Sequence, residues 1–218
     1  GEDPGDPTAV NRPFPYRGDT DLKELRIGFL EEDFARDYPG AELDRAALGE
    51  LKAAGAALVP VAFPLEEIGV PNPWDLLVIL EAEAGAAFQE LVLNNQDDLL
   101  VRQRAQDWPN IFRAAQFIPA VEYIQANRAR LRLQDMMAAL FQDIDVLVVP
   151  SLQSVSLMIT NLTGQPQVVL PDGFLAPNKP HSISFVADIF DEASALAVAR
   201  VYQERTGWHR QHPAAFMP

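Results

Sequence analysis

Residues 145–174 read DVLVVPSLQSVSLMITNLTGQPQVVLPDGF, in which two apolar runs are separated and followed by proline, glycine and polar residues. The first run, residues 144–149, predicts a buried strand that ends at Pro150, and the second run, residues 167–170, predicts another strand. Proteins with α/β folds bind their ligands in the turns that follow their strands. The stretch is therefore a candidate binding segment, although structural turns are the better interpretation of these residue types by themselves.

The flanking sequence predicts the rest of an α/β fold. Apolar runs at residues 25–30 and 57–63 predict strands, and between them residues 41–54 place apolar side chains on one face of a helix. This order predicts a right-handed crossover between two parallel strands, with Pro60 at an edge of the sheet or in a bulge. The remaining elements expected are helices at residues 74–93, 118–141 and 191–205, and a strand at residues 182–187 after a turn-rich segment. The predicted fold class is α/β, with a mixed sheet flanked by helices.

Composition along the chain indicates its domain organisation. Residues 1–24 are rich in proline and show little periodicity, which predicts an extended linker. Residues 25–218 show no comparable break, so we expect them to form a single α/β domain. Within it, the last helix is expected to begin at Asp191 as its N-cap and to end at Gly207.

The overall composition excludes several classes of function. The 218 residues include 17 Lys and Arg and 31 Asp and Glu, which gives a net charge of −14. A chain this acidic is not expected to bind nucleic acid or an anionic membrane, because both require a basic face. The absence of cysteine excludes disulfides, iron–sulfur clusters and a cysteine nucleophile. No apolar run approaches the roughly 20 residues of a membrane-spanning helix, and the first residues do not resemble a signal peptide, so a cytoplasmic location is expected.

Side chains able to perform chemistry are few. The histidines are His181, His209 and His212, and no serine occupies the G-x-S-x-G turn that exposes a nucleophile. A Ser-His-Asp triad is therefore not expected, and surface histidines are the better interpretation. His209 and His212 have no carboxylate or third histidine near them in the sequence, so no metal site is expected. The chain has no glycine-rich phosphate loop, and no cofactor is expected.

Four segments, taken in order, resemble the amidase signature family. Members of this family typically carry a helix with Y-I-Q-A-x-R-x-R, a strand of the form D-h-h-h-x-P-[ST], the sequence N-x-[TA]-G-x-P and a P-x-G-F turn. The matching segments of this chain are residues 123–130, 145–151, 161–166 and 171–174. Residues 3–10 are similar to the family's linker and residues 204–209 to its carboxyl terminus. The resemblance covers nearly the whole chain, but only the carboxyl-terminal half or so of a family member.

The resemblance implies a partial amidase-signature fold and a parent enzyme that hydrolyses amide bonds. Family members use a lysine, a serine in a cis peptide and a nucleophilic serine, the serines lying in a Gly/Ser-rich stretch. No position here matches them, since no two serines are adjacent and Lys23, Lys52 and Lys179 lie in other contexts. No catalytic residue is therefore assigned, and this chain alone is expected to be inactive. The partners expected are the missing amino-terminal half of the same enzyme, a small amide substrate in the full-length protein, and a second copy in a homo-oligomer.

The resemblance also implies which residues line the substrate pocket. Six residues are expected to form one wall: Pro150, Ser151, Ser154, Asn161, Thr163 and Gly164. Two alternatives stay open, namely a non-catalytic binding domain and the matching part of the A-type chain of a glutamyl-tRNA(Gln) amidotransferase. In amidotransferase chains of this type an aspartate usually stands seven residues before the asparagine of N-x-[TA]-G-x-P, and this chain has Ser154 there. Because serine carries no charge to grip the amino group of glutamine, the sequence favours a stand-alone amide hydrolase with a mostly apolar acyl pocket.

Overall fold

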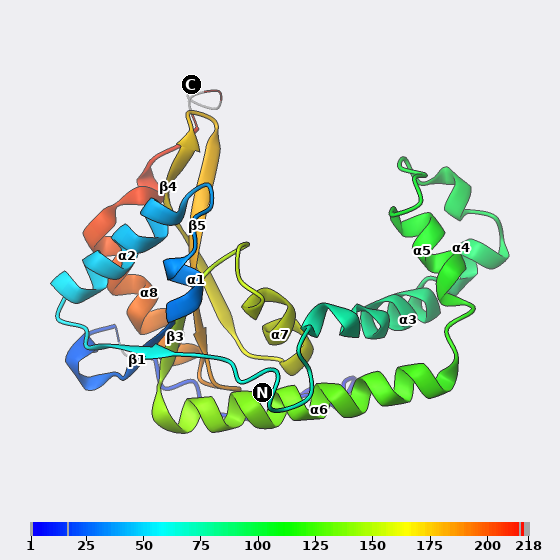
Figure 1. Cartoon of the computed structure of the whole chain (residues 1–218), viewed down its shortest axis with the longest axis horizontal. Coiled ribbons are helices and arrows are strands. Elements are labelled where there is room, and N and C mark those ends of the chain that lie inside the picture. The colour runs from blue at the N-terminus through cyan, green and yellow to red at the C-terminus, as the bar shows by residue number, and fades with distance from the viewer. Residues whose placement is uncertain (1, 17, 214, 216–218) are drawn as a thin grey trace. The chain divides into compact units, whose positions relative to one another are not determined.

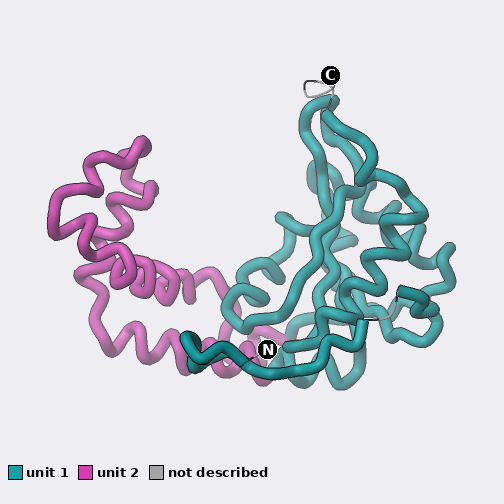
Figure 2. The backbone as a smooth tube through the Cα atoms, turned by 180° about the vertical axis from the view of Figure 1, so that it is seen from behind, with its two compact units in different colours: residues 1–63, 136–218 teal, residues 64–135 magenta. Residues whose placement is uncertain are grey.

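The structure is a computed structural model that describes residues 2–16, 18–213 and 215. Contacts divide the chain into two compact units, coloured separately in Figure 2. Unit 1 comprises residues 1–63 and 136–218, and unit 2 comprises residues 64–135. The single domain expected over residues 25–218 stays a prediction. The helix α6 (Ala120–Asp143) continues through residues 135 and 136, so the sequence contains no linker at that boundary.

A mixed five-stranded sheet forms the centre of unit 1 (Figure 1). Its strands are β1 (Ile27–Leu30), β2 (Leu58–Val61), β3 (Val146–Pro150), β4 (Gln167–Ala176) and β5 (Lys179–Ala187). They lie in the order β2-β1-β3-β5-β4. β1 is parallel to β2 and β3, whereas β5 is antiparallel to β3 and β4. The predicted α/β class and mixed sheet are confirmed.

The crossover predicted from residues 25–63 is present. β1 is followed by α1 (Glu31–Ala35) and α2 (Ala41–Ala53), and β2 then pairs parallel to β1. Gly55 lies just beyond α2 in a left-handed conformation with φ of 97°, as is common where a helix ends. Pro60 lies on β2 at an edge of the sheet, as predicted, and an edge strand is where proline is tolerated.

Helices α2 and α8 (Glu192–Thr206) pack on the sheet and on each other. In Figure 1 they lie on the opposite side of the sheet from α7 (Ser156–Thr163). The core beneath α2 and α8 contains side chains that are at most 8% exposed, among them Ile27, Phe34, Leu48, Leu51, Val146, Val148, Ile183, Phe185, Val198 and Tyr202. Asp191 accepts a hydrogen bond from the Ser194 N–H at 3.3 Å, and Gly207 follows α8 with φ of 65°, so both predicted caps are confirmed. The short 3-10 helix η4 (Trp208–Arg210) follows α8.

The β4–β5 hairpin extends through residues 171–181, which the sequence predicted as turns because of their prolines. Pro171 is tolerated because β4 is an edge strand. Pro180 is tolerated because β3 pairs with β5 only from Ile183 onward. The two strands are therefore longer than their apolar runs indicated.

A helix lies where the sequence predicted a polar loop. α7 covers Asn161 and Thr163, and Gly164 follows it in a left-handed conformation with φ of 92°. Serine, threonine and asparagine favour turns, because their side chains compete for backbone hydrogen bonds. The buried apolar side chains of α7 outweigh that local preference; they are Met158, Ile159 and Leu162.

The segment predicted as a linker contains little regular structure. Among its described residues this structure is limited to an isolated bridge between Asp3 and Asp6 and the 3-10 helix η1 (Leu22–Glu24). Leu22 is 2% exposed and belongs to the core of unit 1. The end of this segment is therefore anchored to the sheet.

Unit 2 is built of helices. Besides most of α6 it contains η2 (Pro73–Leu76), α3 (Leu77–Ala87), α4 (Gln89–Leu93), the 3-10 helix η3 (Asp97–Leu99) and α5 (Trp108–Ala115). The helix predicted at residues 74–93 is thus three consecutive segments. α3 and α5 approach closely at Gly85, where an added Cβ would lie 2.5 Å from the Ala115 Cβ. Within the described part of the chain, no helix has the length and apolar character needed to cross a membrane.

Candidate functional site

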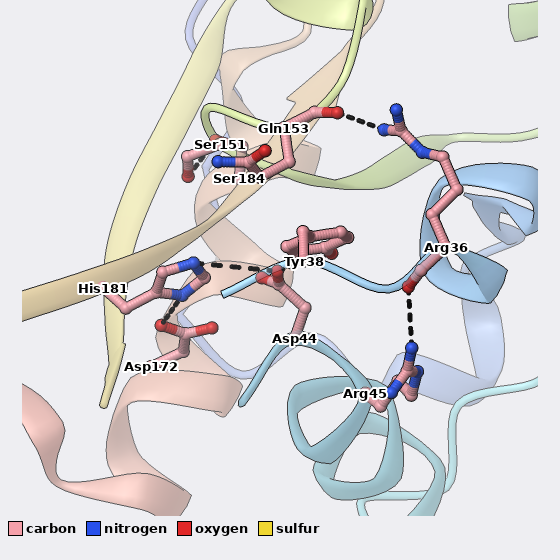
Figure 3. Close-up of polar contacts among 9 residues, drawn as sticks. All are labelled: Arg36, Tyr38, Asp44, Arg45, Ser151, Gln153, Asp172, His181 and Ser184. Atoms are coloured by element: carbon pink, nitrogen blue, oxygen red, sulfur yellow. Dashed lines mark hydrogen bonds and ion pairs between the residues drawn. The ribbon is translucent and has the colours of Figure 1, made fainter. Parts of the chain in front are cut away.

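Unit 1 contains two clusters of buried polar side chains, and the first lies at the end of β3. The Ser151 hydroxyl, directly after β3, lies 2.8 Å from the Ser184 hydroxyl on β5, as Figure 3 shows. The Gln167 amide on β4 donates to the same Ser184 hydroxyl at 2.7 Å, and the Thr160 hydroxyl on α7 donates to the Gln167 side-chain carbonyl at 3.3 Å. We call these four residues the strand-end cluster. Their hydrogen bonds connect α7 to three strands of the sheet.

The loop between β3 and α7 is held against α1. Ser154 is 4% exposed, its hydroxyl accepts a hydrogen bond from the Ser156 N–H at 3.0 Å, and Asp33 of α1 lies near it. Arg36 pairs with Asp33 at 2.7 Å. Arg36 also donates to the Gln153 carbonyl, as Figure 3 shows. Burial raises the pKa of Asp33, an effect that the nearby Ser154 hydroxyl and the Arg36 charge partly offset. Ser154 therefore has a carboxyl group near it, which Asp33 of α1 supplies.

The six residues predicted to line a pocket divide between interior and surface. The buried ones are Pro150, Ser151, Ser154 and Thr163, and the exposed ones are Asn161 and Gly164. The Thr163 hydroxyl and the Asn161 amide donate to backbone carbonyls within α7, at 2.7 and 2.8 Å. The structure places Ser151 and Ser154 together on the loop after β3, and Asn161, Thr163 and Gly164 at the end of α7.

The second cluster consists of Asp44, Asp172 and His181, which we call the carboxylate–histidine cluster. Asp172 and His181 lie on opposite strands of the β4–β5 hairpin, where the pairing register shifts between Pro171 and Gly173. Such a bulge leaves one residue unpaired and redirects its side chain. Here the unpaired residue is Asp172, whose carboxylate meets the His181 ring. Asp44 enters from the first turn of α2.

Two glycines allow these elements to approach one another. Gly173 has φ of 153°, and a Cβ added there would lie 2.8 Å from the Leu43 Cδ2. Gly40 precedes α2 with φ of 102°, and a Cβ there would overlap the His181 ring. Side chains at these positions would hold α2 away from the hairpin, so both glycines are required by the cluster.

The three side chains of the cluster converge, as Figure 3 shows. His181 Nδ1 lies 2.9 Å from Asp172 Oδ1, and His181 Nε2 lies 3.9 Å from Asp44 Oδ2. The Tyr38 hydroxyl donates to Asp44 Oδ2 at 2.8 Å. Both aspartate side chains are 0% exposed, and the histidine side chain is 12% exposed. One ligand-type atom from each of the three residues lies within 4.8 Å of the others.

Burial governs the electrostatics of this cluster. It raises the pKa of Asp44 to about 7, with a further increase from the charge of Asp172, while the Tyr38 hydrogen bond opposes the rise. Burial also raises the pKa of Asp172, against the hydrogen bond and charge of His181. Both carboxylates are therefore poorly compensated by positive charge.

The sequence did not predict this cluster. His181 was expected to be a surface histidine, whereas its side chain is largely buried and paired with Asp172. His209 and His212 are exposed, as expected. The missing information was the strand register and the position of Asp44, neither of which the local sequence contains.

Unit 2 contains a cavity of about 390 Å³. It is lined by Ala82, Glu83, Ala86, Ala115, Ile118, Ala120 and Tyr123. At this cavity the Tyr123 hydroxyl donates to Glu83 Oε1 at 3.0 Å. None of the six predicted pocket residues lines this cavity.

Known proteins are similar to this chain over nearly all of its length. The family model described as Amidase matches residues 1–180. The chain is 27% identical to the A-type chain of the glutamyl-tRNA(Gln) amidotransferase of Microcystis aeruginosa, over 98% of this chain and 52% of that protein. It is 26% identical to an amidase of Pseudomonas putida, over 98% of this chain and 50% of that protein. The chain thus spans about half the length of the curated relatives it matches.

Solved structures share the fold at lower identity. 6-Aminohexanoate cyclic dimer hydrolase matches 100% of this chain and 53% of its own, with a TM-score of 0.69 and 19% identity. Allophanate hydrolase of Kluyveromyces lactis matches 89% of this chain and 34% of its own, with a TM-score of 0.66 and 20% identity. At these identities the similarity shows the fold alone.

Proposed function

The chain belongs to the Amidase family, and from this premise we propose that it forms the carboxyl-terminal part of an enzyme that hydrolyses the carbon–nitrogen bond of an amide. The observation that carries the proposal is the match of the family model to residues 1–180. Because the chain spans about half of each curated relative, we place the catalytic lysine and serines in the part of the family fold that lies outside it. No catalytic role is assigned to a residue of this chain.

In this proposal the end of β3 and α7 form one wall of the substrate pocket. A pocket wall must hold its shape, and its lining side chains are best fixed by hydrogen bonds to residues that do not themselves line the pocket. The strand-end cluster supplies such support, because it connects the Ser151 hydroxyl through Ser184 and Gln167 to α7. The proposed lining residues remain Pro150, Ser151, Ser154, Asn161, Thr163 and Gly164.

Ser154 favours a simple amide over glutamine as the substrate. Loss of one charge-assisted hydrogen bond to an amino group would typically cost about 1.5–3 kcal/mol, which corresponds to about one to two decades in affinity. One observation favours the second candidate, a glutamine-dependent amidotransferase: the Asp33 carboxyl group lies beside Ser154. We rank amide hydrolysis first because Arg36 already pairs with Asp33 at 2.7 Å.

The test compares the chain alone with the chain extended at its amino terminus by the upstream coding sequence of its gene. The chain alone is expected to turn over neither aryl nor alkyl amides, because no Ser/Lys pair is available to form an acyl-enzyme. The extended protein is expected to hydrolyse simple amides without a second protein. Release of the amine or of ammonia measures both activities.

Two outcomes would change the assignment. Turnover by the chain alone that is lost in Ser151→Ala or Ser154→Ala, but kept in the matched control Ser194→Ala, would mean that the chain contains its own nucleophile. Efficient glutamine hydrolysis coupled to tRNA amidation by the extended protein would favour the amidotransferase instead.

A further inference from the structure

The carboxylate–histidine cluster contains buried oxygen atoms without hydrogen-bond donors. Among the described residues, Asp44 Oδ1 and Asp172 Oδ2 are buried and have no hydrogen-bond partner. Each belongs to a side chain that is 0% exposed and that converges on the other two members of the cluster (Figure 3). An unpaired buried carboxylate oxygen is costly, so these atoms indicate a missing positive partner.

Other unpaired carboxylate oxygens in the chain have an arginine nearby. Asp33 pairs with Arg36 and Asp97 pairs with Arg113, so the charge of each carboxylate is compensated. In the ion pairs described for this chain, Asp44 and Asp172 share His181 as their basic partner. One imidazole cannot balance two buried carboxylates, even when it is protonated. The cluster therefore requires a proton or a cation.

We propose that Asp44, Asp172 and His181 bind one divalent transition-metal cation of the class of Zn²⁺ or Mn²⁺. The three residues supply two carboxylate oxygens and one imidazole nitrogen, all within 4.8 Å of one another. That donor set suits Zn²⁺ and Mn²⁺ better than Ca²⁺, which takes six to eight oxygen ligands, or Mg²⁺, which keeps several waters. Three protein ligands would leave a position for water, and the His181 side chain is 12% exposed.

Neighbouring groups support the proposed ligands. The Tyr38 hydroxyl fixes the Asp44 carboxylate at 2.8 Å, as groups outside a metal site commonly do for its ligands. Gly40 and Gly173 bring α2 and the β4–β5 hairpin close enough for the three side chains to share one ion. A bound ion would join α2, β4 and β5, so the site would stabilise unit 1 independently of amide hydrolysis.

The test is isothermal titration calorimetry of the chelator-treated protein, without a polyhistidine tag, using Zn²⁺ and then Mn²⁺. We expect one ion per chain and a higher melting temperature in the bound protein. Asp172→Asn and His181→Gln should each weaken binding by about tenfold or more. The matched control is the double variant His209→Gln, His212→Gln, which removes the exposed tail histidines and should bind as the wild type does.

Specific results would overturn the proposal. Absence of stoichiometric binding would mean that the carboxylates share a proton instead. Binding that is lost in the His209→Gln, His212→Gln variant and kept in His181→Gln would place the metal on the tail. If a cluster variant does not keep the wild-type circular dichroism spectrum, the deciding measurement is the absorption spectrum of Co²⁺ added to the His209→Gln, His212→Gln protein. A spectrum unlike that of aqueous Co²⁺ and abolished by one equivalent of Zn²⁺ supports the site, and an unchanged spectrum overturns it.

Discussion

Gly173 meets two constraints that other residue types do not meet together. Its φ of 153° is strained for a residue with a Cβ, and that Cβ would lie 2.8 Å from the Leu43 Cδ2. Gly49, in the middle of α2, offers a contrast, because nothing lies within 4 Å of the Cβ that could be added there. The two positions separate a glycine that the fold requires from one that it merely tolerates.

We predict opposite effects of alanine at these two glycines. Gly173→Ala should lower the free energy of unfolding by about 2 kcal/mol through backbone strain and overpacking. Gly49→Ala should raise it by about 0.5–1 kcal/mol, because alanine is the better helix former. Urea denaturation followed by circular dichroism measures both changes. Equal effects at the two positions would contradict the role given to Gly173.

Single residues were predictable from the sequence where a local rule governs them. Asp191 and Gly207 cap α8 through contacts within a few residues, and Pro60 marks an edge strand because of its own missing N–H. His181 was not predictable in this way. Its partner Asp172 depends on the hairpin register, and Asp44 arrives only when α2 packs on the sheet.

At the scale of elements, one ion pair joins the beginnings of β1 and β3. The Arg26 N–H donates to Asp145 Oδ2 at 2.7 Å, and the guanidinium donates to the two carboxylate oxygens at 2.6 and 3.2 Å. The Asp145 N–H donates in turn to the Arg26 carbonyl at 2.8 Å. These contacts fix the register of two parallel strands, which gives a physical role to the aspartate that opens the segment at residues 145–151.

We predict that this pair makes stability depend on acidic pH. Hydrogen bonds from Arg26 lower the pKa of Asp145 below its ordinary value, which is about 3.9. The stabilisation is therefore complete above about pH 4 and is lost as the pH falls through the lowered pKa. Asp145→Asn should reduce the free energy of unfolding by about 1 kcal/mol at neutral pH, a value kept small because the pair is partly exposed.

Denaturation of the wild type and of Asp145→Asn, measured from neutral pH down through the lowered pKa of Asp145, checks the prediction. The difference between them should shrink as the solution becomes acidic. Glu204→Gln is the matched control, because Glu204 pairs with Arg200 at 2.7 Å on an exposed helix face and should contribute less than about 0.5 kcal/mol. A difference for Asp145→Asn that stays constant down to strongly acidic pH would refute the electrostatic explanation.

The elements that the sequence predicted best are those whose apolar pattern is uninterrupted. β1, β3, α2, α6 and α8 all follow such patterns, and each lies close to its expected range. α7 and the long β4–β5 hairpin were missed because polar residues and prolines suggest turns when they are considered locally. Burial of one face of α7 and the edge position of β4 override those local preferences.

At the scale of the whole molecule, the comparisons and the exposed surface of unit 2 lead us to expect that a region outside this chain packs on part of unit 2. The chain spans about half of its curated relatives. On α6, the apolar side chains of Val121, Ile124 and Leu131 are each more than half exposed, and Phe117 just before it is 85% exposed. Apolar surface gathered along one helix is unusual on a free monomer. We therefore expect this face, defined by these four residues, to pack against the part of the family fold outside this chain.

The last prediction is that the isolated chain associates through this α6 face. Exposed apolar side chains are driven together in water, so the chain alone should form concentration-dependent oligomers and bind a hydrophobic dye. The double variant Ile124→Lys, Leu131→Lys should shift the chain toward monomer and reduce dye binding, as measured by light scattering after size exclusion. Gln125→Lys adds a charge beside Ile124 without removing apolar surface, so it should behave more like the wild type. A wild-type chain that stays monomeric and binds no dye would contradict the expectation that a region outside this chain packs on this face. Association that survives the double variant would place the contact on another surface.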